Sequence, residues 1–204
     1  MNIKKISKII AFIFVIAGLI LILGKRAWFP NFYNPLYNGT MAFVSAFLIL
    51  LPRLVFKPKD SEQEKMLNLI QVGALIVLSL SALGGLGFYQ LYKYGFQYDK
   101  LVHFIASAIF TIVIVELYWP WHKVSFKKSV ILSIIIIFVA GIAWELYEFS
   151  VDVLFKTEML GIYGQYITED TIWDIIMNCF GVIAAATGLG ILKSHKSDLI
   201  NKVG

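Results

Sequence analysis

The sequence contains one cysteine, Cys179, in 204 residues. A lone cysteine excludes a disulfide within the chain and a metal site made of several thiolates. Charged residues are also scarce: they make up 15% of the chain, whereas soluble domains carry about 25%. So little charge cannot cover the surface of a soluble domain of this length.

Hydrophobic residues take the place of the missing charge. They account for 59% of the chain, and the mean hydropathy is +0.77. A helix that crosses a hydrocarbon core about 30 Å thick needs about 20 apolar residues. Long apolar runs without strict alternation indicate helices. We therefore expect residues 1–204 to form one domain, an all-α polytopic membrane helix bundle. Its six transmembrane helices are expected at about 6–24, 39–56, 66–92, 101–119, 129–150 and 170–192.

The net charge of +5 follows the expected topology. Most basic residues fall at the N-terminus, between helices two and three, between helices four and five, and after helix six. The positive-inside rule then places both termini in the cytoplasm, in a multi-pass protein of the inner (plasma) membrane. We expect the lipid bilayer, and not nucleic acid, to be the partner of this charge. The basic residues in these four cytoplasmic places are Lys4, Lys5, Lys8, Arg53, Lys57, Lys59, Lys65, Lys123, Lys127, Lys128, Lys193, Lys196 and Lys202.

Ionisable residues recur at helical spacing near the outer ends of the last three expected helices. Residues separated by three, four or seven positions share one face of a helix. Each of the three helices therefore presents a polar stripe at the same depth. The stripes are Asp99 and His103; Glu145, Glu148 and Asp152; and Asp170, Asp174, Asn178 and Gly181.

Energetics predicts where these stripes point. An Asp at the centre of a membrane helix costs about 2.5–3.5 kcal/mol on the insertion scale. The cost falls towards the interface, yet several carboxylates facing lipid would still be hard to tolerate. We expect them to face the bundle interior and to form one acid/His cluster in the outer leaflet. Gly181 would let a neighbouring helix approach closely below that cluster.

As a catalytic site, the cluster would use His103 as the acid or base, oriented by Asp99 or Glu145. The Asp174 carboxylate would tune the imidazole or hold an ion. The cofactor is not identified by the sequence, but one histidine among many oxygens suits Mg²⁺, Mn²⁺ or Ca²⁺ better than structural zinc. Candidate metal ligands are Glu145, Asp174 and His103, with Asn178 as a hydrogen-bond donor. Candidate substrate-binding residues are Glu148, Asp170, Asn178 and Thr171.

Two other uses of the cluster stay open. Its polar groups could only hydrogen-bond the last three helices together, although such contacts are worth about 0.6 kcal/mol each. They could also relay protons or bind a transported ion, which would require a polar path towards the cytoplasm. The inner halves of these helices are nearly all apolar, which makes transport the third choice.

Three motifs, "YDKLVHF", "WELYE" and "DTIWDIIMNCFG", resemble the signatures of the VanZ-like and YjdF-like bacterial membrane proteins. The resemblance covers about the second half of the chain, and Glu148 stands where the VanZ pattern has Gln, which favours the YjdF-like branch. It implies a multi-span cell-envelope protein and supplies no substrate. If the protein is an enzyme, we expect a hydrolase or transferase that acts on a lipid or lipid-linked envelope molecule. The matching residues are Asp99, Lys100, His103, Phe104, Glu145, Glu148, Asp170, Thr171, Asp174, Asn178 and Gly181.

Overall fold

A computed structural model describes residues 2–25, 28, 34–155, 159 and 167–203. This part of the chain holds six long helices and no strand, which confirms the predicted all-α membrane bundle. Each helix is long and apolar enough to cross a bilayer. The helices are α1 (Ile3–Leu23), α2 (Pro35–Val55), α3 (Ser61–Gly85), α4 (Tyr98–Glu116), α5 (Phe126–Phe155) and α6 (Ile167–Val203).

Local sequence explains where three of these helices begin. A side-chain oxygen at the N-cap accepts a hydrogen bond from a backbone N–H of the first turn, which would otherwise lack a partner. Asn2 caps α1 in this way, Asn34 caps α2, and Asp60 caps α3. In α2 the cap is followed by Pro35, whose fixed backbone angle suits the first position of a helix.

Helix three is shorter than the predicted 66–92. The α-helix ends at Gly85, and Gly87 follows with φ of +120°, a conformation that a residue with a side chain rarely adopts. The chain continues as the 3-10 helix η2 (Phe88–Tyr94), which leads back into α4. Helices α5 and α6 are longer than the predicted 129–150 and 170–192, because the helical backbone continues beyond both ends of each predicted apolar run. A π-helical turn, η3 (Leu117–Trp121), ends α4.

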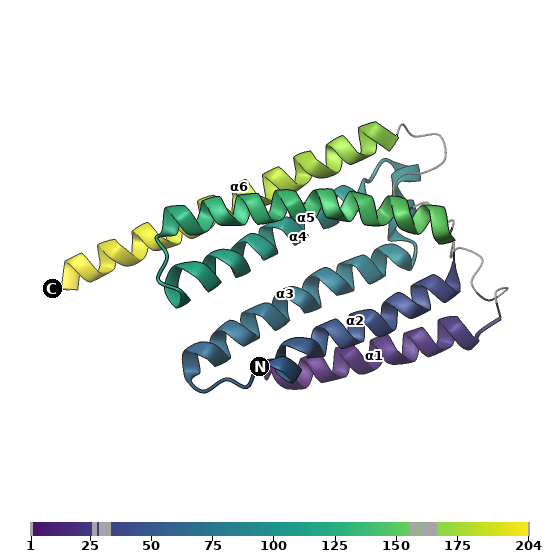
Figure 1. The fold of residues 1–204 in the computed structure, drawn as a ribbon, viewed down its shortest axis with the longest axis horizontal. Coiled ribbons are helices and arrows are strands. Elements are labelled where there is room, and N and C mark those ends of the chain that lie inside the picture. The colour runs from purple at the N-terminus through teal and green to yellow at the C-terminus, as the bar shows by residue number, and fades with distance from the viewer. Residues whose placement is uncertain (1, 26–27, 29–33, 156–158, 160–166, 204) are drawn as a thin grey trace.

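The six helices form two groups of three (Figure 1). Helices α1, α2 and α3 lie on one side, and α4, α5 and α6 lie on the other, with α3 packed against α4. The most extensive pairings are α1 with α2 and α4 with α6. Because the helices alternate in direction, both termini lie at one end of the bundle, which we call the termini end (Figure 1). The opposite end, which carries the starts of α4 and α6 and the end of α5, is called the site end.

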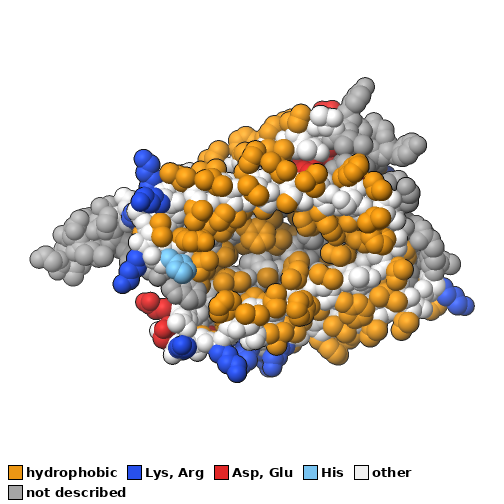
Figure 2. All heavy atoms as spheres, in the orientation of Figure 1, with side chains coloured by type: hydrophobic (Ala, Val, Ile, Leu, Met, Phe, Trp, Pro, Cys, Tyr) orange, Lys and Arg blue, Asp and Glu red, His pale blue; other side chains and the backbone are white. Residues whose placement is uncertain are grey.

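The outside of the bundle has the polarity that a bilayer requires. Hydrophobic side chains cover the long face shown in Figure 2, and most of the visible Lys and Arg side chains gather towards the termini end. Large apolar residues such as Leu23, Leu154 and Ile183 are exposed in the isolated chain. Such a surface is stable only when lipid covers it.

A polar clip joins α2 and α3 at the termini end. The Arg53 guanidinium donates to both oxygens of the Glu64 carboxylate, at 3.1 and 2.7 Å. It also donates to Asn68 and to Gln71, and the buried Gln71 amide donates in turn to the carbonyl of Ile49. Every polar group of this clip has a partner, so its role is to fasten the two helices.

Candidate functional site

The first turns of α4 carry three charged or titratable side chains towards the bundle interior. Asp99 and His103 lie one turn apart on the same face, as their spacing predicts. Lys100 is the next residue after Asp99, and its long side chain reaches across to α6. This placement makes the start of α4 the centre of the site.

Lys100 connects the acids of the two helices. Its Nζ lies 2.6 Å from Asp170 Oδ1 and 2.8 Å from Asp174 Oδ1, both on α6. It also lies 3.2 Å from Oδ2 of Asp99, its neighbour in α4. The side chain of Lys100 is 12% exposed and that of Asp174 is 1% exposed, so this network is largely removed from solvent. An ammonium among three carboxylates stabilises the pairing of α4 with α6.

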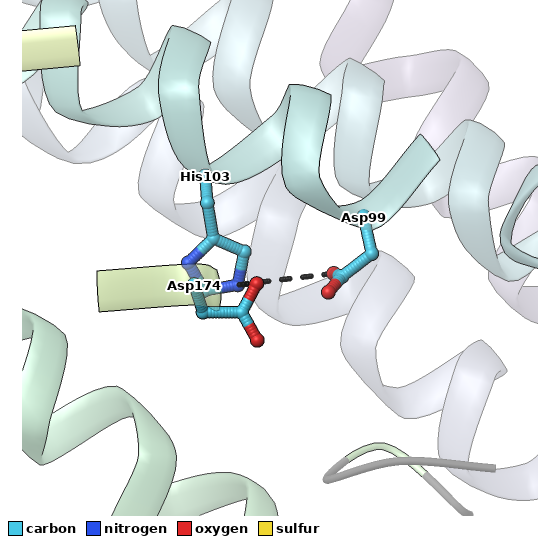
Figure 3. A group of neighbouring side chains, drawn as sticks. All are labelled: Asp99, His103 and Asp174. Carbon is cyan, nitrogen blue, oxygen red and sulfur yellow. Dashed lines mark ion pairs between the residues drawn. The ribbon is translucent and has the colours of Figure 1, made fainter. Parts of the chain in front are cut away.

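The imidazole of His103 points at two of the same carboxylates (Figure 3). Its Nε2 is 3.6 Å from Asp174 Oδ1 and 3.8 Å from Asp99 Oδ1. These separations are longer than a hydrogen bond, which brings the two heavy atoms to about 2.7–3.2 Å. The ring is therefore aimed at the carboxylates without bonding directly to either of them.

Helix α5 contributes two buried acids that have different partners. Oε2 of Glu145 accepts a hydrogen bond from the Thr171 hydroxyl of α6, at 2.9 Å. Its other oxygen, Oε1, is buried and has no partner among the described residues. Glu148 accepts a hydrogen bond from the indole N–H of Trp144, one turn earlier in its own helix, at 2.7 Å. Glu145 is thus tied to α6 beside Asp170, whereas the hydrogen bond from Trp144 to Glu148 stays within α5.

One turn below His103, α4 and α6 are joined again. The Ser107 hydroxyl lies 2.5 Å from Asn178 Oδ1 and 2.7 Å from the carbonyl oxygen of His103. Asn178 accepts in this contact, and its Nδ2 lies against Gly141 of α5, where a Cβ would come within 3.1 Å. These contacts hold α4 and α6 together on the side of the cluster nearer the termini end, and they fix the backbone of His103.

The 3-10 helix η2 covers the start of α4. The ring of Tyr89 packs edge-on against Tyr98, and the Tyr98 hydroxyl donates to the carbonyl of Leu80 in α3. Burial raises the pKa of Tyr89, and the negative charges of Asp99 and Glu148 raise it further. Tyr89 is therefore a neutral phenol that borders the acids.

The predicted site residues fall into three groups. The structure brings Asp99, His103, Asp170 and Asp174 together directly, places Glu145 with Thr171 and Asn178 with Ser107 around them, and leaves Glu148 bonded to Trp144. Sequence reasoning gave no role to Lys100, the residue with the most partners. The signal was present in "YDKLVHF", because Lys100 directly follows Asp99 and lies three positions, about one helical turn, before His103.

The fold and the site define a polytopic helical membrane protein with an acid/His cluster at one end of its bundle. Residues 6–195 match the model of the family described as "Predicted membrane protein (DUF2238)", and the chain belongs to that family. Comparisons with curated proteins and with solved structures give no match.

Proposed function

We propose that this protein is a hydrolase or transferase of the cell envelope that acts on a lipid or lipid-linked molecule. The observation that carries the proposal is the position of His103. Its buried imidazole faces two carboxylates at the end of a membrane helix, and one of them, Asp99, is 31% exposed. A histidine with this access to solvent can exchange protons with a reacting group at the bilayer surface.

In the proposed reaction His103 acts as general base and then as general acid. Its Nε2 removes a proton from water or from an acceptor hydroxyl while that oxygen attacks the substrate. It then returns the proton to the leaving group as the substrate bond breaks. Asp99 and Asp174 stabilise the imidazolium between these two steps, and the Lys100 ammonium holds Asp174 in place.

The charge of the cluster limits the substrate. Three carboxylates surround one lysine, and Glu145 adds a fourth acid next to them. An anionic headgroup would be repelled unless a cation stood between it and these acids. The reacting part of the substrate is therefore neutral, or it binds through a cation, while its acyl chains lie against the apolar exterior.

The charge pattern and the sequence motifs support an envelope location. Among the residues that the structure describes, most of the basic side chains visible in Figure 2 lie towards the termini end. The positive-inside rule then favours a cytoplasmic location for that end in a plasma-membrane protein. The site end would then face outwards. The resemblance to VanZ-like and YjdF-like proteins is consistent with this direction.

The proposal is tested by turnover with purified protein in lipid nanodiscs. An extract of envelope lipids is incubated with the wild type and with His103→Gln, and released headgroups and transferred products are measured by mass spectrometry. We expect a product with the wild type and a rate at least about 100-fold lower with His103→Gln, since general acid–base catalysis contributes about 10²–10⁴-fold.

Glu169→Gln is the matched control, because Glu169 is an exposed acid in the first turn of α6. It should keep the wild-type rate. If both proteins are folded and His103→Gln has the wild-type rate, His103 does not take part in the reaction. The cluster would then serve only to hold the helices together.

Transport is the second candidate, and one observation favours it. His103, Ser107 and Thr111 follow one another at four-residue steps on α4, and all three are buried. The Thr111 hydroxyl has no partner among the described residues. These three residues continue the polar cluster along α4 towards the termini end. The interior face of α4 is therefore more polar than the sequence analysis predicted. Proton or cation flux into proteoliposomes that is abolished by Thr111→Val would favour transport over catalysis.

A further inference from the structure

Three side chains of the cluster have the geometry of a cation site. One oxygen of Asp99, Nε2 of His103 and one oxygen of Asp174 all lie within 4.8 Å of one another. A metal ion bound at about 2.1 Å to each of its ligands holds neighbouring ligand atoms about 3–4 Å apart. The measured separations from Nε2, 3.6 and 3.8 Å, fall in that range and are too long for hydrogen bonds.

One buried polar atom points to a ligand in addition to the acids. Oε1 of Glu145, on the facing helix α5, is buried and has no partner among the described residues. The His103 side chain is 8% exposed, and its Nε2 lies beyond hydrogen-bond distance of both carboxylates that it faces. Buried polar groups normally have partners, so an unpartnered oxygen beside a cluster of carboxylates and an imidazole indicates a ligand.

The charge of the cluster also indicates a cation. Asp99, Asp170 and Asp174 carry three negative charges when ionised, and Lys100 supplies one positive charge. A formal excess of two negative charges is left in a largely buried position within a membrane helix bundle, where uncompensated charge is costly. One divalent cation would neutralise the excess of these four residues, and Glu145 beside them is a further acid.

We propose that Asp99, His103 and Asp174 bind one divalent metal ion, with Lys100 as a tethered competitor for the same carboxylates. In the structure the ammonium holds Asp174 Oδ1, the atom that also faces the imidazole. On metal binding the ammonium leaves Asp174 and keeps its shorter contact with Asp170, at 2.6 Å. This site differs from the ligand set that the sequence suggested, because Asp99 replaces Glu145.

The ligand types define the class of ion. Imidazole nitrogen suits transition metals, and carboxylate oxygen suits Mg²⁺, Ca²⁺ and Mn²⁺. Mn²⁺ is common to both preferences, so it is the probe that the site should accept. The inference goes beyond the proposed function and does not depend on it, since the cluster could hold a metal ion without catalysing a reaction. Nε2 of His103 cannot hold the ion and accept a proton at the same time, so its proposed role as general base belongs to the protein without the ion.

The test measures Mn²⁺ binding by electron paramagnetic resonance, in which the six-line signal of free Mn²⁺ is lost when the ion is bound. Protein in nanodiscs is stripped with EDTA, exchanged into metal-free buffer and titrated. We expect one Mn²⁺ per chain for the wild type and for Glu169→Gln. Binding should be at least about tenfold weaker for Asp174→Asn and for His103→Gln, because each loses a direct ligand.

Lys100→Met tests the competitor directly. It removes the ammonium and keeps an apolar stem of similar length, so Mn²⁺ affinity should rise by about tenfold. Thermal unfolding gives a second readout: Mn²⁺ should raise the melting temperature of Lys100→Met more than that of the wild type.

Three results would overturn the inference. The folded wild type could take up no Mn²⁺, which would mean that protons neutralise the acids. Asp174→Asn could bind Mn²⁺ as the wild type does, or Lys100→Met could bind it more weakly. Failure of the proposed function looks different, because Mn²⁺ would still bind while no product formed.

Discussion

Lys100 shows what residue spacing does and does not predict. Spacing predicted correctly that Asp99 and His103 share a face and that Asp170 and Asp174 form a stripe on α6, because helical periodicity fixes where each Cβ lies. It did not predict that Lys100 would cross to α6. A lysine side chain has four rotatable bonds, and its direction depends on acids 70 and 74 residues later in the chain. Which residues a long side chain contacts is therefore decided by the tertiary structure and not by local spacing.

Thr171 offers a test at the same scale. Among the described residues, its hydroxyl is the hydrogen-bond partner of Glu145 Oε2, and Oε1 has none. Thr171→Val keeps the shape and removes the donor, so both oxygens of a buried carboxylate would lack a partner. We expect the free energy of unfolding to fall by about 1–3 kcal/mol, the cost of an unsatisfied buried group.

The measurement is unfolding of the purified protein in mixed micelles, followed by circular dichroism. Thr171→Ser is the rescue control, since it restores a hydroxyl and should recover most of the loss. A Thr171→Val protein as stable as the wild type would mean that Glu145 finds another partner, such as water or an ion.

At the scale of elements, the sequence predicted how many helices there are better than where they end. Apolar length fixes the number of spans, since about 20 residues are needed for each. Helix ends depend on caps and on backbone geometry, and apolar length does not report these. Helix α3 therefore ends at Gly85, before the predicted 92, because of the positive φ at Gly87. Helices α5 and α6 extend past the predicted apolar runs, since charged residues such as Lys and Glu form helices as readily as most apolar ones and do not end them.

The pairing of α4 with α6 depends on one glycine. A Cβ at Gly181 would collide with the carbonyl oxygen of Phe104 and would lie 3.0 Å from both the Ala108 nitrogen and the Ser107 Cβ. Two of these neighbours are backbone atoms, which cannot move aside as a flexible side chain can. We expect Gly181→Ala to push the helices apart and to lower the free energy of unfolding by about 1–3 kcal/mol, as overpacking does.

Gly188→Ala is the control for this prediction, because it lies two turns further along α6 with nothing within 4 Å of its would-be Cβ. There the intrinsic preference of Ala for helix should stabilise the protein slightly, by up to about 1 kcal/mol. If both variants shifted stability by the same amount and sign, close helix approach at Gly181 would not be what holds α4 against α6.

At the scale of the whole molecule, the two ends of the bundle differ in chemistry. The termini end has the Arg53 clip, in which every polar group is paired, and most of the basic residues. Among the described residues, the site end has an excess of acids, an imidazole beyond hydrogen-bond distance of the two carboxylates that it faces, and an unpartnered carboxylate oxygen. A polar cluster that served only to fasten helices would resemble the first end. The contrast between the ends supports a ligand at the second.

The orientation of these ends is the prediction on which an envelope substrate depends. Cys179 is the only cysteine, so Cys179→Ser gives a cysteine-free background. In that background Glu169→Cys places a thiol at the site end, and Lys127→Cys places one near the termini end; both positions are exposed. A membrane-impermeant maleimide added to intact cells should label the first thiol and should reach the second only after the cells are broken, because the positive-inside rule predicts that the basic end faces the cytoplasm. The reverse pattern would put the acid/His cluster on the cytoplasmic side, and a lipid-linked substrate in the outer leaflet could no longer reach it.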